Sequence, residues 1–261
     1  MEMKITVLGC GTSVGIPALG RAGWGSCDPL NPKNRRQRCA ILVETDNTTI
    51  LVDAGPDIRN QLLPLNIKKL DAVLITHTHS DHVAGMDDLR VFYWPDEKKI
   101  NLFGSSEHGK SVTDRFPYLF NKAPSSPSYF QPPLEWNTIQ TDETFTIGDI
   151  EIRTLYQKHG NGFSLGFVFN GKIAYSTDVS ELDDTYLNSI ANIPIWIVET
   201  LREAPHSAHA HFDLTFSWIN KVKPNRSYLT HLGLESDYEA LMSICPANVE
   251  PSFDGLVLQV D

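Results

Sequence analysis

A cluster of histidine and aspartate residues directly after a short apolar run constrains this sequence more than any other feature. The run at residues 72–75 reads Ala-Val-Leu-Ile and predicts a buried strand. Four potential metal ligands then follow within six residues: His77, His79, Asp81 and His82. Neutral imidazole and carboxylate groups together suit zinc, manganese or iron. The alternative is a polar loop that is rich in histidine by chance, and three histidines and an aspartate in this order after a strand disfavour it.

The spacing within the cluster separates the ligands into two pairs. His77 and His79 are two positions apart, so both rings lean the same way if the backbone stays extended beyond the strand. Asp81 and His82 follow Ser80, a residue type that commonly caps a helix, and they therefore turn away from the first pair. One pair can bind one ion and the second pair another.

Length and composition predict one large domain, residues 1–261, in a cytoplasmic protein. The 261 residues are 41% apolar, and we find no run of about 18 apolar residues that would span a membrane. The chain enters a strand pattern at once, without the regions of a signal peptide. The four cysteines form no CxxC pair, which is typical of reduced thiols in the cytoplasm. The net charge of −10 argues against a surface that tracks long nucleic acids, but not against a small phosphate ester held by metal ions.

The order of the predicted elements indicates an α/β fold with two sheets. Apolar and alternating patterns predict strands at 4–8, 39–44, 49–52, 72–75, 100–103, 145–156, 164–169, 173–176, 195–198, 227–230 and 256–260. Helices are predicted at 56–65, 86–90, 105–120, 183–190 and 213–222, the last capped by Asp213. Residues 18–38 and 121–140 read as irregular, the second as the most mobile loop. Two packed sheets with helices outside fit this order.

Three further polar residues lie at the ends of predicted apolar strands. His159 follows the strand that ends at Tyr156, Asp178 follows residues 173–176, and His231 follows residues 227–230. Taken singly, each is more often a satisfied surface residue than a ligand. A strand followed by a ligand, repeated along the chain, is how open sheets build a site at one edge, so we expect these side chains to join the cluster.

With these residues in order, the chain resembles the metallo-β-lactamase-fold hydrolases over nearly its whole length. The motif at 77–82 and the three later residues match the binuclear site of that family. The resemblance implies a four-layer αββα sandwich of two mixed β-sheets with helices outside. It also implies two divalent metal ions per chain, either zinc or manganese.

The resemblance assigns a role to each candidate ligand. The first ion would be bound by His77, His79 and His159, and the second by Asp81, His82 and His231. Asp178 would bridge both ions. Asp53, which follows the predicted strand at 49–52, matches a position that steadies the histidine cluster from outside the ligand set.

Within this fold, the chain is similar to the phosphodiesterase branch, especially the phosphoribosyl 1,2-cyclic phosphate phosphodiesterases of phosphonate breakdown. The similarity rests on residues 8–13, 34–38, 85–90 and 229–232. Between Glu199 and Asp213 the branch carries a histidine that binds no metal and looks like its proton donor. We favour His211, because His211 and the residues after it fit a histidine just before a capped helix. His209 is the second choice.

One part of the branch's pattern is missing. The branch holds an extra structural zinc with three cysteines early in the chain and a histidine after the last catalytic ligand. Here Cys27 stands alone in that loop, and Leu234 occupies the fourth position. We therefore expect no third metal.

The resemblance implies a metal-dependent hydrolase: a binuclear phosphodiesterase that converts a small phosphodiester, of the cyclic ribose or nucleotide kind, to a phosphomonoester. A hydroxide shared by the two ions would attack, and a histidine would act as general acid for the leaving oxygen. The expected partner is a small-molecule phosphodiester, with no membrane and no long nucleic acid, and a homodimer is left open.

Other functions of the same fold stay under consideration. A tRNA 3′-processing endonuclease shares the ligands, but it grips tRNA with a long basic arm that we do not find. A β-lactamase is normally exported, and a thioester hydrolase of the glyoxalase II kind carries a C-terminal helical domain. A non-catalytic metal- or ligand-binding member, like the one involved in pyrroloquinoline quinone synthesis, needs no second metal.

Overall fold

Two seven-stranded β-sheets form the centre of the computed structural model, which describes residues 2–260. The first sheet has the order β14-β1-β2-β3-β4-β5-β6, and the second has the order β13-β12-β11-β10-β9-β8-β7. The strands of the first sheet are β1 (Met3–Gly9), β2 (Ala40–Glu44), β3 (Thr49–Val52), β4 (Ala72–Leu74), β5 (Ile100–Gly104), β6 (Leu134–Thr138) and β14 (Val257–Val260). Those of the second are β7 (Thr144–Ile147), β8 (Ile150–His159), β9 (Gly162–Phe169), β10 (Ile173–Ser176), β11 (Ile195–Glu199), β12 (Arg226–Thr230) and β13 (Val249–Pro251).

Both sheets are mixed in the same way. In the first sheet, β14, β1, β2 and β3 pair antiparallel, and β3, β4, β5 and β6 pair parallel. In the second, β7 to β10 pair antiparallel, and β10 to β13 pair parallel. Since carboxyl ends of neighbouring parallel strands meet at one edge, each sheet offers one such edge for a site.

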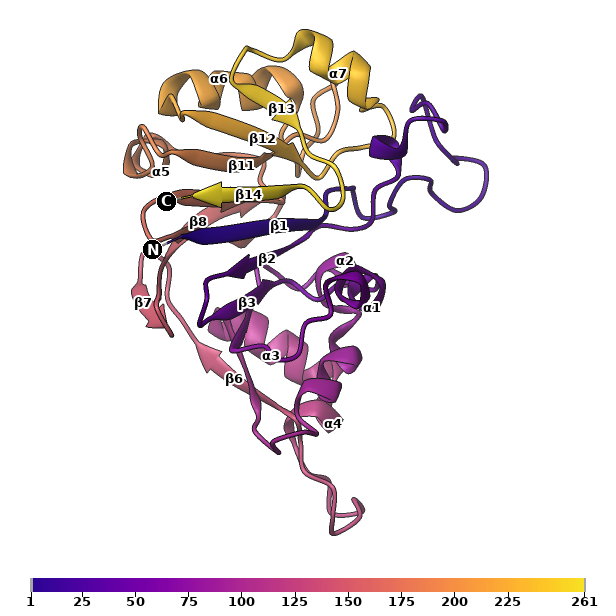
Figure 1. The fold of residues 1–261 in the computed structure, drawn as a ribbon, viewed down its shortest axis with the longest axis vertical. Coiled ribbons are helices and arrows are strands. Elements are labelled where there is room, and N and C mark those ends of the chain that lie inside the picture. The colour runs from indigo at the N-terminus through magenta and orange to yellow at the C-terminus, as the bar shows by residue number, and fades with distance from the viewer. Residues whose placement is uncertain (1, 261) are drawn as a thin grey trace.

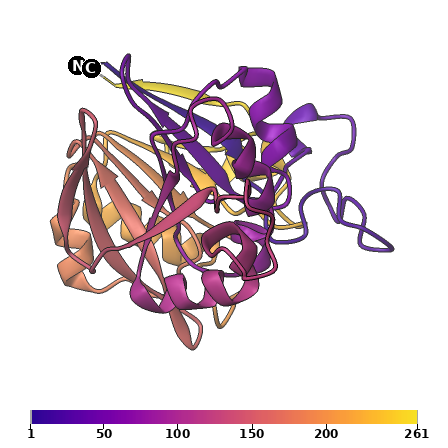
Figure 2. The same cartoon turned by 90° about the horizontal axis from the view of Figure 1, so that it is seen from below.

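Helices cover the outer faces of the two sheets. The α-helices are α1 (Ile58–Leu62), α2 (Ser80–Val83), α3 (Ser106–Arg115), α4 (Pro117–Phe120), α5 (Asp184–Ser189), α6 (Phe212–Val222) and α7 (Tyr238–Ile244), and three short 3-10 helices are Pro32–Asn34, Leu63–Leu65 and Met86–Phe92. Figure 1 shows α1 to α4 beside the first sheet, and α6 and α7 over the second. The first and last strands lie side by side, because β14 pairs with β1 (Figure 2).

Apolar side chains hold the layers together in two clusters. The larger cluster joins the facing sides of the sheets, for example Ile5 and Val43 of the first sheet and Phe167 of the second, and it extends to Trp218 on α6. The smaller cluster lies between the first sheet and the helices beside it, and includes Leu51 and Val83. The predicted four-layer αββα arrangement of two mixed sheets is thereby confirmed. Among the described residues, no helix has the length and apolar character that crossing a membrane requires.

Several predicted element boundaries were wrong. The segment 121–140, predicted as a loop, contains β6, which adds to the edge of the first sheet parallel to β5. The single strand predicted at 145–156 is a hairpin, β7 and β8, because Gly148 takes a positive φ of 58° at the turn. The sequence patterns also missed α7 and β13.

Two predicted helix caps were also wrong by one or two residues. Helix α6 begins at Phe212 with His211 as its N-cap, and Asp213 lies in its first turn. Helix α2 begins at Ser80 with His79 as its N-cap, so Ser80 is the first helical residue. In both helices the side chain of the N-cap histidine makes no capping hydrogen bond, which is why the pattern of capping residues pointed elsewhere.

Candidate metal centre

The candidate ligands come from strand ends of both sheets. His77 and His79 lie between β4 and α2, and α2 itself carries Asp81 and His82. His159 is the last residue of β8. Asp178 and His231 follow β10 and β12, and both take a positive φ, 54° and 55°. Positive φ is uncommon for residues other than glycine, and residues with positive φ cluster at functional sites. At Asp178 and His231 this backbone conformation sets the direction of the side chain.

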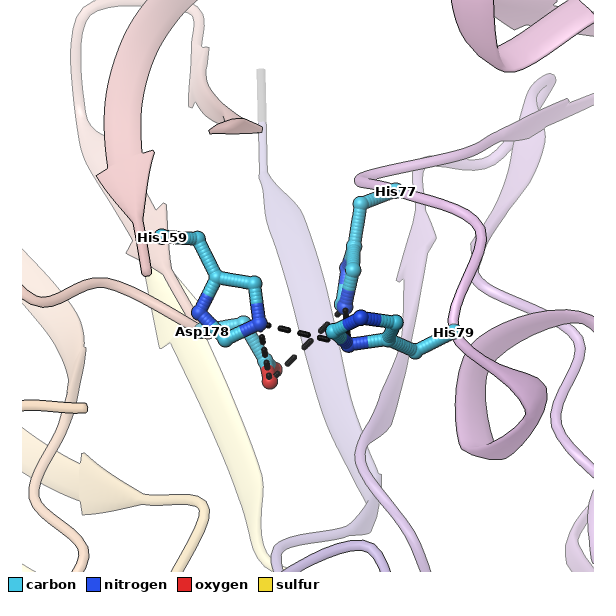
Figure 3. Close-up of side chains that lie close together, drawn as sticks. All are labelled: His77, His79, His159 and Asp178. Carbon is cyan, nitrogen blue, oxygen red and sulfur yellow. Dashed lines mark hydrogen bonds and ion pairs between the residues drawn. The ribbon is translucent and has the colours of Figure 1, made fainter. Parts of the chain in front are cut away.

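A first group of four ligand atoms converges between the sheets (Figure 3). It consists of one atom each from His77, His79, His159 and Asp178, all within 4.8 Å of one another. Nδ1 of His79 lies 3.0 Å from Nε2 of His77 and 3.2 Å from Nε2 of His159. Oδ1 of Asp178 lies 3.8 Å from Nε2 of both His77 and His159. Three imidazole nitrogens and one carboxylate aimed at one point form the donor set that a zinc or manganese ion prefers.

A second group shares Asp178 with the first. It consists of Asp81, His82, Asp178 and His231. Nε2 of His82 lies 3.0 Å from Asp178 Oδ2 and 3.2 Å from Asp81 Oδ2, and Nε2 of His231 lies 3.4 Å from Asp178 Oδ1. These distances suit ion pairs, yet neither Nε2 atom makes a hydrogen bond within the described chain. Buried nitrogens near carboxylates but without hydrogen bonds fit atoms that bind a cation between them.

Contacts outside the ligand set fix the direction of the rings. Asp53, buried at the end of β3, accepts hydrogen bonds from the backbone N–H and the hydroxyl of Thr76, at 2.9 and 2.8 Å. Its Oδ2 lies 2.7 Å from Nδ1 of His82, which leaves Nε2 of that ring for the centre. In the same way, Nδ1 of His159 lies 2.8 Å from the carbonyl oxygen of Ala208. Such contacts orient metal-binding histidines in known sites.

Burial and charge shift the pKa values of the candidate ligands in both directions. Although burial opposes it, Asp178 and other carboxylates raise the pKa of His82 and of His231 well above the usual value, whereas three other ligands are held in their metal-binding forms. Burial, together with the neighbouring His82, holds the pKa of His77 well below its usual value, and burial lowers the pKa of His159. Burial opposes ionisation of Asp178, but His231, His82 and His77 hold its pKa well below the usual range. Neutral imidazole and ionised carboxylate are the forms that bind metal ions.

A third cluster adjoins the second group and contains a residue that the sequence did not single out. Glu199, buried at the end of β11, lies between two rings: its Oε1 is 2.5 Å from Nδ1 of His209 and 3.1 Å from Nδ1 of His231. The ring of His209 stacks on that of His231 with centroids 4.8 Å apart, and its Nδ1 lies 3.8 Å from Asp178 Oδ1. The sequence did contain a signal for Glu199, because this residue follows an apolar run, as the candidate ligands do. That run forms a strand of the sheet that supplies Asp178 and His231.

The two candidate proton donors therefore lie in different surroundings. His209 packs against the ligand groups, whereas His211 is the N-cap of α6. Within residues 2–260, the side chain of His211 makes no hydrogen bond, ion pair or ring contact with the site. The sequence-based preference for His211 over His209 does not agree with this geometry, because the short segment before α6 turns His209 toward Glu199.

The sequence comparison identifies the family. Residues 48–232 match the profile of the Beta-lactamase superfamily domain. The chain belongs to the β-lactamase superfamily. The predicted metallo-β-lactamase fold and the predicted class, a hydrolase that uses divalent metal ions, are thereby confirmed.

Similar proteins extend the comparison. A crystal structure of a diphosphatase from the PhnP family superposes with a TM-score of 0.89 at 29% identity, over 100% of this chain and 98% of the other. An octanoyltransferase of Porphyromonas gingivalis is 29% identical over 99% of this chain, but the chain spans only 52% of that protein's length. A ribonuclease Z of Thermococcus kodakarensis is 27% identical over 55% of this chain and 44% of its own.

Proposed function

We propose that this superfamily member is a two-metal phosphodiesterase that hydrolyses a small phosphodiester to a phosphomonoester. The observation that carries the proposal is the sharing of Asp178 by two complete ligand groups, whose remaining members come from both sheets. The similarity to a PhnP-family protein over the full chain supports it. The number of ions, their identity and the substrate remain part of the proposal.

The ligand residues would hold two ions, which supply an activated water and neutralise charge on the phosphate oxygens. Around them, the chain's own groups keep the ligands in place. Asp53 and Ala208 fix the rings of His82 and His159, and the positive φ of Asp178 directs its carboxylate between the two groups. Because these contacts exist before a substrate arrives, little reorganisation is needed at reaction.

His209 is the proton donor that the geometry favours. Glu199 is buried, and burial raises the pKa of its carboxyl group. His231 and His209 outweigh this effect and lower that pKa below its usual value. Oε1 of Glu199 lies 2.5 Å from Nδ1 of His209, and this contact fixes the direction of the His209 ring. An alkoxide leaving group needs a proton from a group such as this imidazole, and the contribution is typically about 10²–10⁴-fold in rate.

A diphosphate substrate is the second candidate, because the similar PhnP-family structure is that of a diphosphatase. The two chemistries place different demands on His209. Cleavage of a phosphoric anhydride releases a phosphate, which leaves readily as an anion, whereas cleavage of an alkyl ester releases an alkoxide. The Glu199–His209 pair is needed for the ester, so we rank the phosphodiester first.

Two further alternatives receive less support. The ribonuclease Z similarity covers about half of this chain, and the net charge of −10 disfavours a grip on tRNA. A non-catalytic binding member would not need a second group of ligands around Asp178 or the neighbouring pair of Glu199 and His209.

The test is hydrolysis by purified protein loaded with zinc or manganese. We expect turnover of bis(p-nitrophenyl) phosphate and of 2′,3′-cyclic nucleotides, with a slower reaction on ADP-ribose as the anhydride substrate. Asp178→Ala should abolish turnover and lower the metal content. A faster reaction on the anhydride would establish the diphosphatase alternative, and cleavage of precursor tRNA alone would establish the endonuclease.

A further inference from the structure

A cavity of about 420 Å³ lies beside the irregular segment that joins β1 to β2. Residues 15–17 and 35–38 of this segment form most of its lining, together with Asp57, the N-cap of α1, and Asp254, which precedes β14. None of the candidate metal ligands lines this cavity. The volume is within the range of about 300–1,000 Å³ that is usual for small-ligand pockets. The cavity is therefore a candidate binding site apart from the metal centre.

The charged residues of the lining carry more positive than negative charge. Arg35, Arg36 and Arg38 line the cavity together with two aspartates, Asp57 and Asp254. Both aspartates already have partners within the chain. The two oxygens of Asp254 accept hydrogen bonds from backbone N–H groups at 3.1 and 2.7 Å. Oδ2 of Asp57 accepts from the backbone N–H of Arg38 at 3.0 Å and lies 3.2 Å from Nη1 of the same residue. The arginines are therefore the groups that remain for a ligand.

Arg36 carries a buried charge without an acidic partner. Only 1% of its surface is exposed, and within residues 2–260 it forms no ion pair. Nη1 donates to the carbonyl oxygen of Ser236 at 2.7 Å, and Nη2 donates to the side-chain oxygen of Asn34 at 3.3 Å. Nε has no hydrogen-bond partner in the same part of the chain. A buried guanidinium whose hydrogen bonds all go to neutral groups is costly, and an anion in the adjoining cavity would offset that cost.

Arg38 and Arg35 also have donors that the chain does not use. Nε of Arg38 is shielded from solvent and has no hydrogen-bond partner among the described residues. Arg35 is exposed and forms no ion pair within residues 2–260, and its guanidinium lies 5.0 Å from the centre of the Trp24 ring. A guanidinium group offers five donors in a planar fork that matches the oxygens of phosphate or carboxylate. Two arginines with unused donors beside a third, buried one favour binding of an anion.

We propose that this cavity binds the phosphate group of a small phosphorylated molecule, held by Arg35 and Arg38 and balanced by the buried charge of Arg36. A phosphate monoester carries about 1.5 to 2 negative charges at neutral pH, more than a carboxylate, and so suits several arginines better. The volume leaves room for the rest of a small molecule. The inference depends neither on the metal centre nor on the proposed phosphodiesterase activity.

The experiment is a calorimetric titration of the protein with inorganic phosphate and, separately, with ribose 5-phosphate. The protein is first stripped of metal with a chelator and then dialysed, so that metal ions do not bind the probes. We expect one site per chain, with an affinity that falls as the salt concentration rises. Arg35→Gln and Arg38→Gln should each weaken binding by about 10-fold or more, as loss of a charge-assisted hydrogen bond implies. Arg38→Lys keeps the charge but not the planar fork, and should weaken binding less than Arg38→Gln.

Matched controls separate this site from a general attraction of anions. Arg226→Gln removes an arginine outside the cavity, one that pairs with Glu250, and should leave the affinity for phosphate unchanged. Because Arg35 is exposed, Arg35→Gln keeps the test open even if Arg38→Gln does not fold. No saturable binding of phosphate to wild type, or equal binding by wild type and both glutamine variants in the cavity, would overturn the inference. Acetate binding as tight as phosphate binding would show a carboxylate site and overturn the assignment to phosphate.

Discussion

At the scale of single residues, Asp53 lies outside the candidate ligand set and contacts one of its rings directly. It is buried, and it accepts from Thr76 while its Oδ2 lies 2.7 Å from Nδ1 of His82. Burial raises the pKa of Asp53, and His82 and Thr76 counteract that effect. The strength of this contact depends on the carboxylate charge, which an amide lacks.

We therefore predict that Asp53→Asn lowers metal affinity or kcat by about 10- to 100-fold. The amide keeps the shape of the side chain but no longer stabilises the donating Nδ1–H of His82. Titration of the metal-free variant with zinc, followed by kinetics at saturating metal, separates the two effects. Asp149→Asn, in the turn between β7 and β8, is the matched control, because Asp149 accepts a hydrogen bond from Thr45 and belongs to none of the ligand groups. Wild-type affinity and kcat in Asp53→Asn would show that this contact is dispensable.

His209 and His211 can be separated by the acidity of the leaving group. If His209 donates the proton, His209→Ala should lower kcat by about 10²–10⁴-fold on alkyl phosphodiesters and far less on p-nitrophenyl esters, which leave without a proton. His211→Ala should reduce turnover of both kinds of ester equally, if at all. Metal content is measured in parallel for both variants. If only His211→Ala shows a loss of kcat that depends on the leaving group, then His211 and not His209 is the proton donor.

The candidate ligands could be picked out from the sequence because each follows a recognisable apolar strand. His77 to His82, His159, Asp178 and His231 all do so, and the structure brings the seven together. Glu199 follows such a strand too, but a single glutamate carries no family signal. The choice between His209 and His211 depends on how residues 200–211 turn, and no periodic pattern specifies that path.

Helix α2 is the element whose placement matters most, since it carries Asp81 and His82. Two glycines allow it to approach the loop after β3. A Cβ atom at Gly55 would overlap the backbone oxygen of Asp81, and one at Gly85 would overlap the backbone oxygen of Gly55. Helix α2 is only four residues long, so these close contacts rather than helix propensity fix its position.

We predict that Gly55→Ala destabilises the protein by about 1–3 kcal/mol, because the added methyl group displaces α2. Metal affinity should fall as well, since Asp81 moves with the helix. Gly162→Ala is the control for thermal unfolding, because a Cβ atom there meets only an ordinary contact at 3.8 Å. Equal unfolding temperatures for the two variants would contradict the role given to Gly55.

Strands with a strong hydrophobic pattern could be predicted from the sequence. Strands that form mainly because they pair with a neighbouring strand could not. The core strands β1, β3, β10 and β11 are buried at all or all but one of their residues, and they lie close to their predicted bounds. By contrast, β6 reads Leu-Glu-Trp-Asn-Thr, and only its first residue is buried. Its strand conformation comes from pairing with β5, which a local pattern cannot reveal.

At the scale of the whole molecule, Asp254 joins segments from opposite ends of the chain. It precedes β14, and its two oxygens accept hydrogen bonds from the backbone N–H groups of Cys10 at 3.1 Å and Gln37 at 2.7 Å. Burial raises the pKa of Asp254 from 3.8 to about 6. The folded protein thus keeps a proton that the unfolded chain has already released.

This raised pKa predicts a pH dependence of folding. A carboxyl group whose pKa is higher in the folded state stabilises the folded protein most below pH 3.8. This contribution to the free energy of unfolding is lost as the pH rises to about 6. The free energy of unfolding of wild type relative to Asp254→Asn should therefore fall by about 2 kcal/mol between pH 4 and 7. Denaturant unfolding with a chelator present measures it without metal release. Parallel curves for the two proteins would show that Asp254 ionises normally.

The most direct test of the account is a titration of the metal-free protein with zinc or manganese, following hydrolysis of bis(p-nitrophenyl) phosphate as metal is added. Because Asp178 belongs to two complete ligand groups, activity should rise until about two ions are bound per chain and then stay constant. Elemental analysis of the protein at the plateau should give the same two ions. Full activity with a single ion, a requirement for a third, or no hydrolysis at any metal content would contradict the two-metal phosphodiesterase.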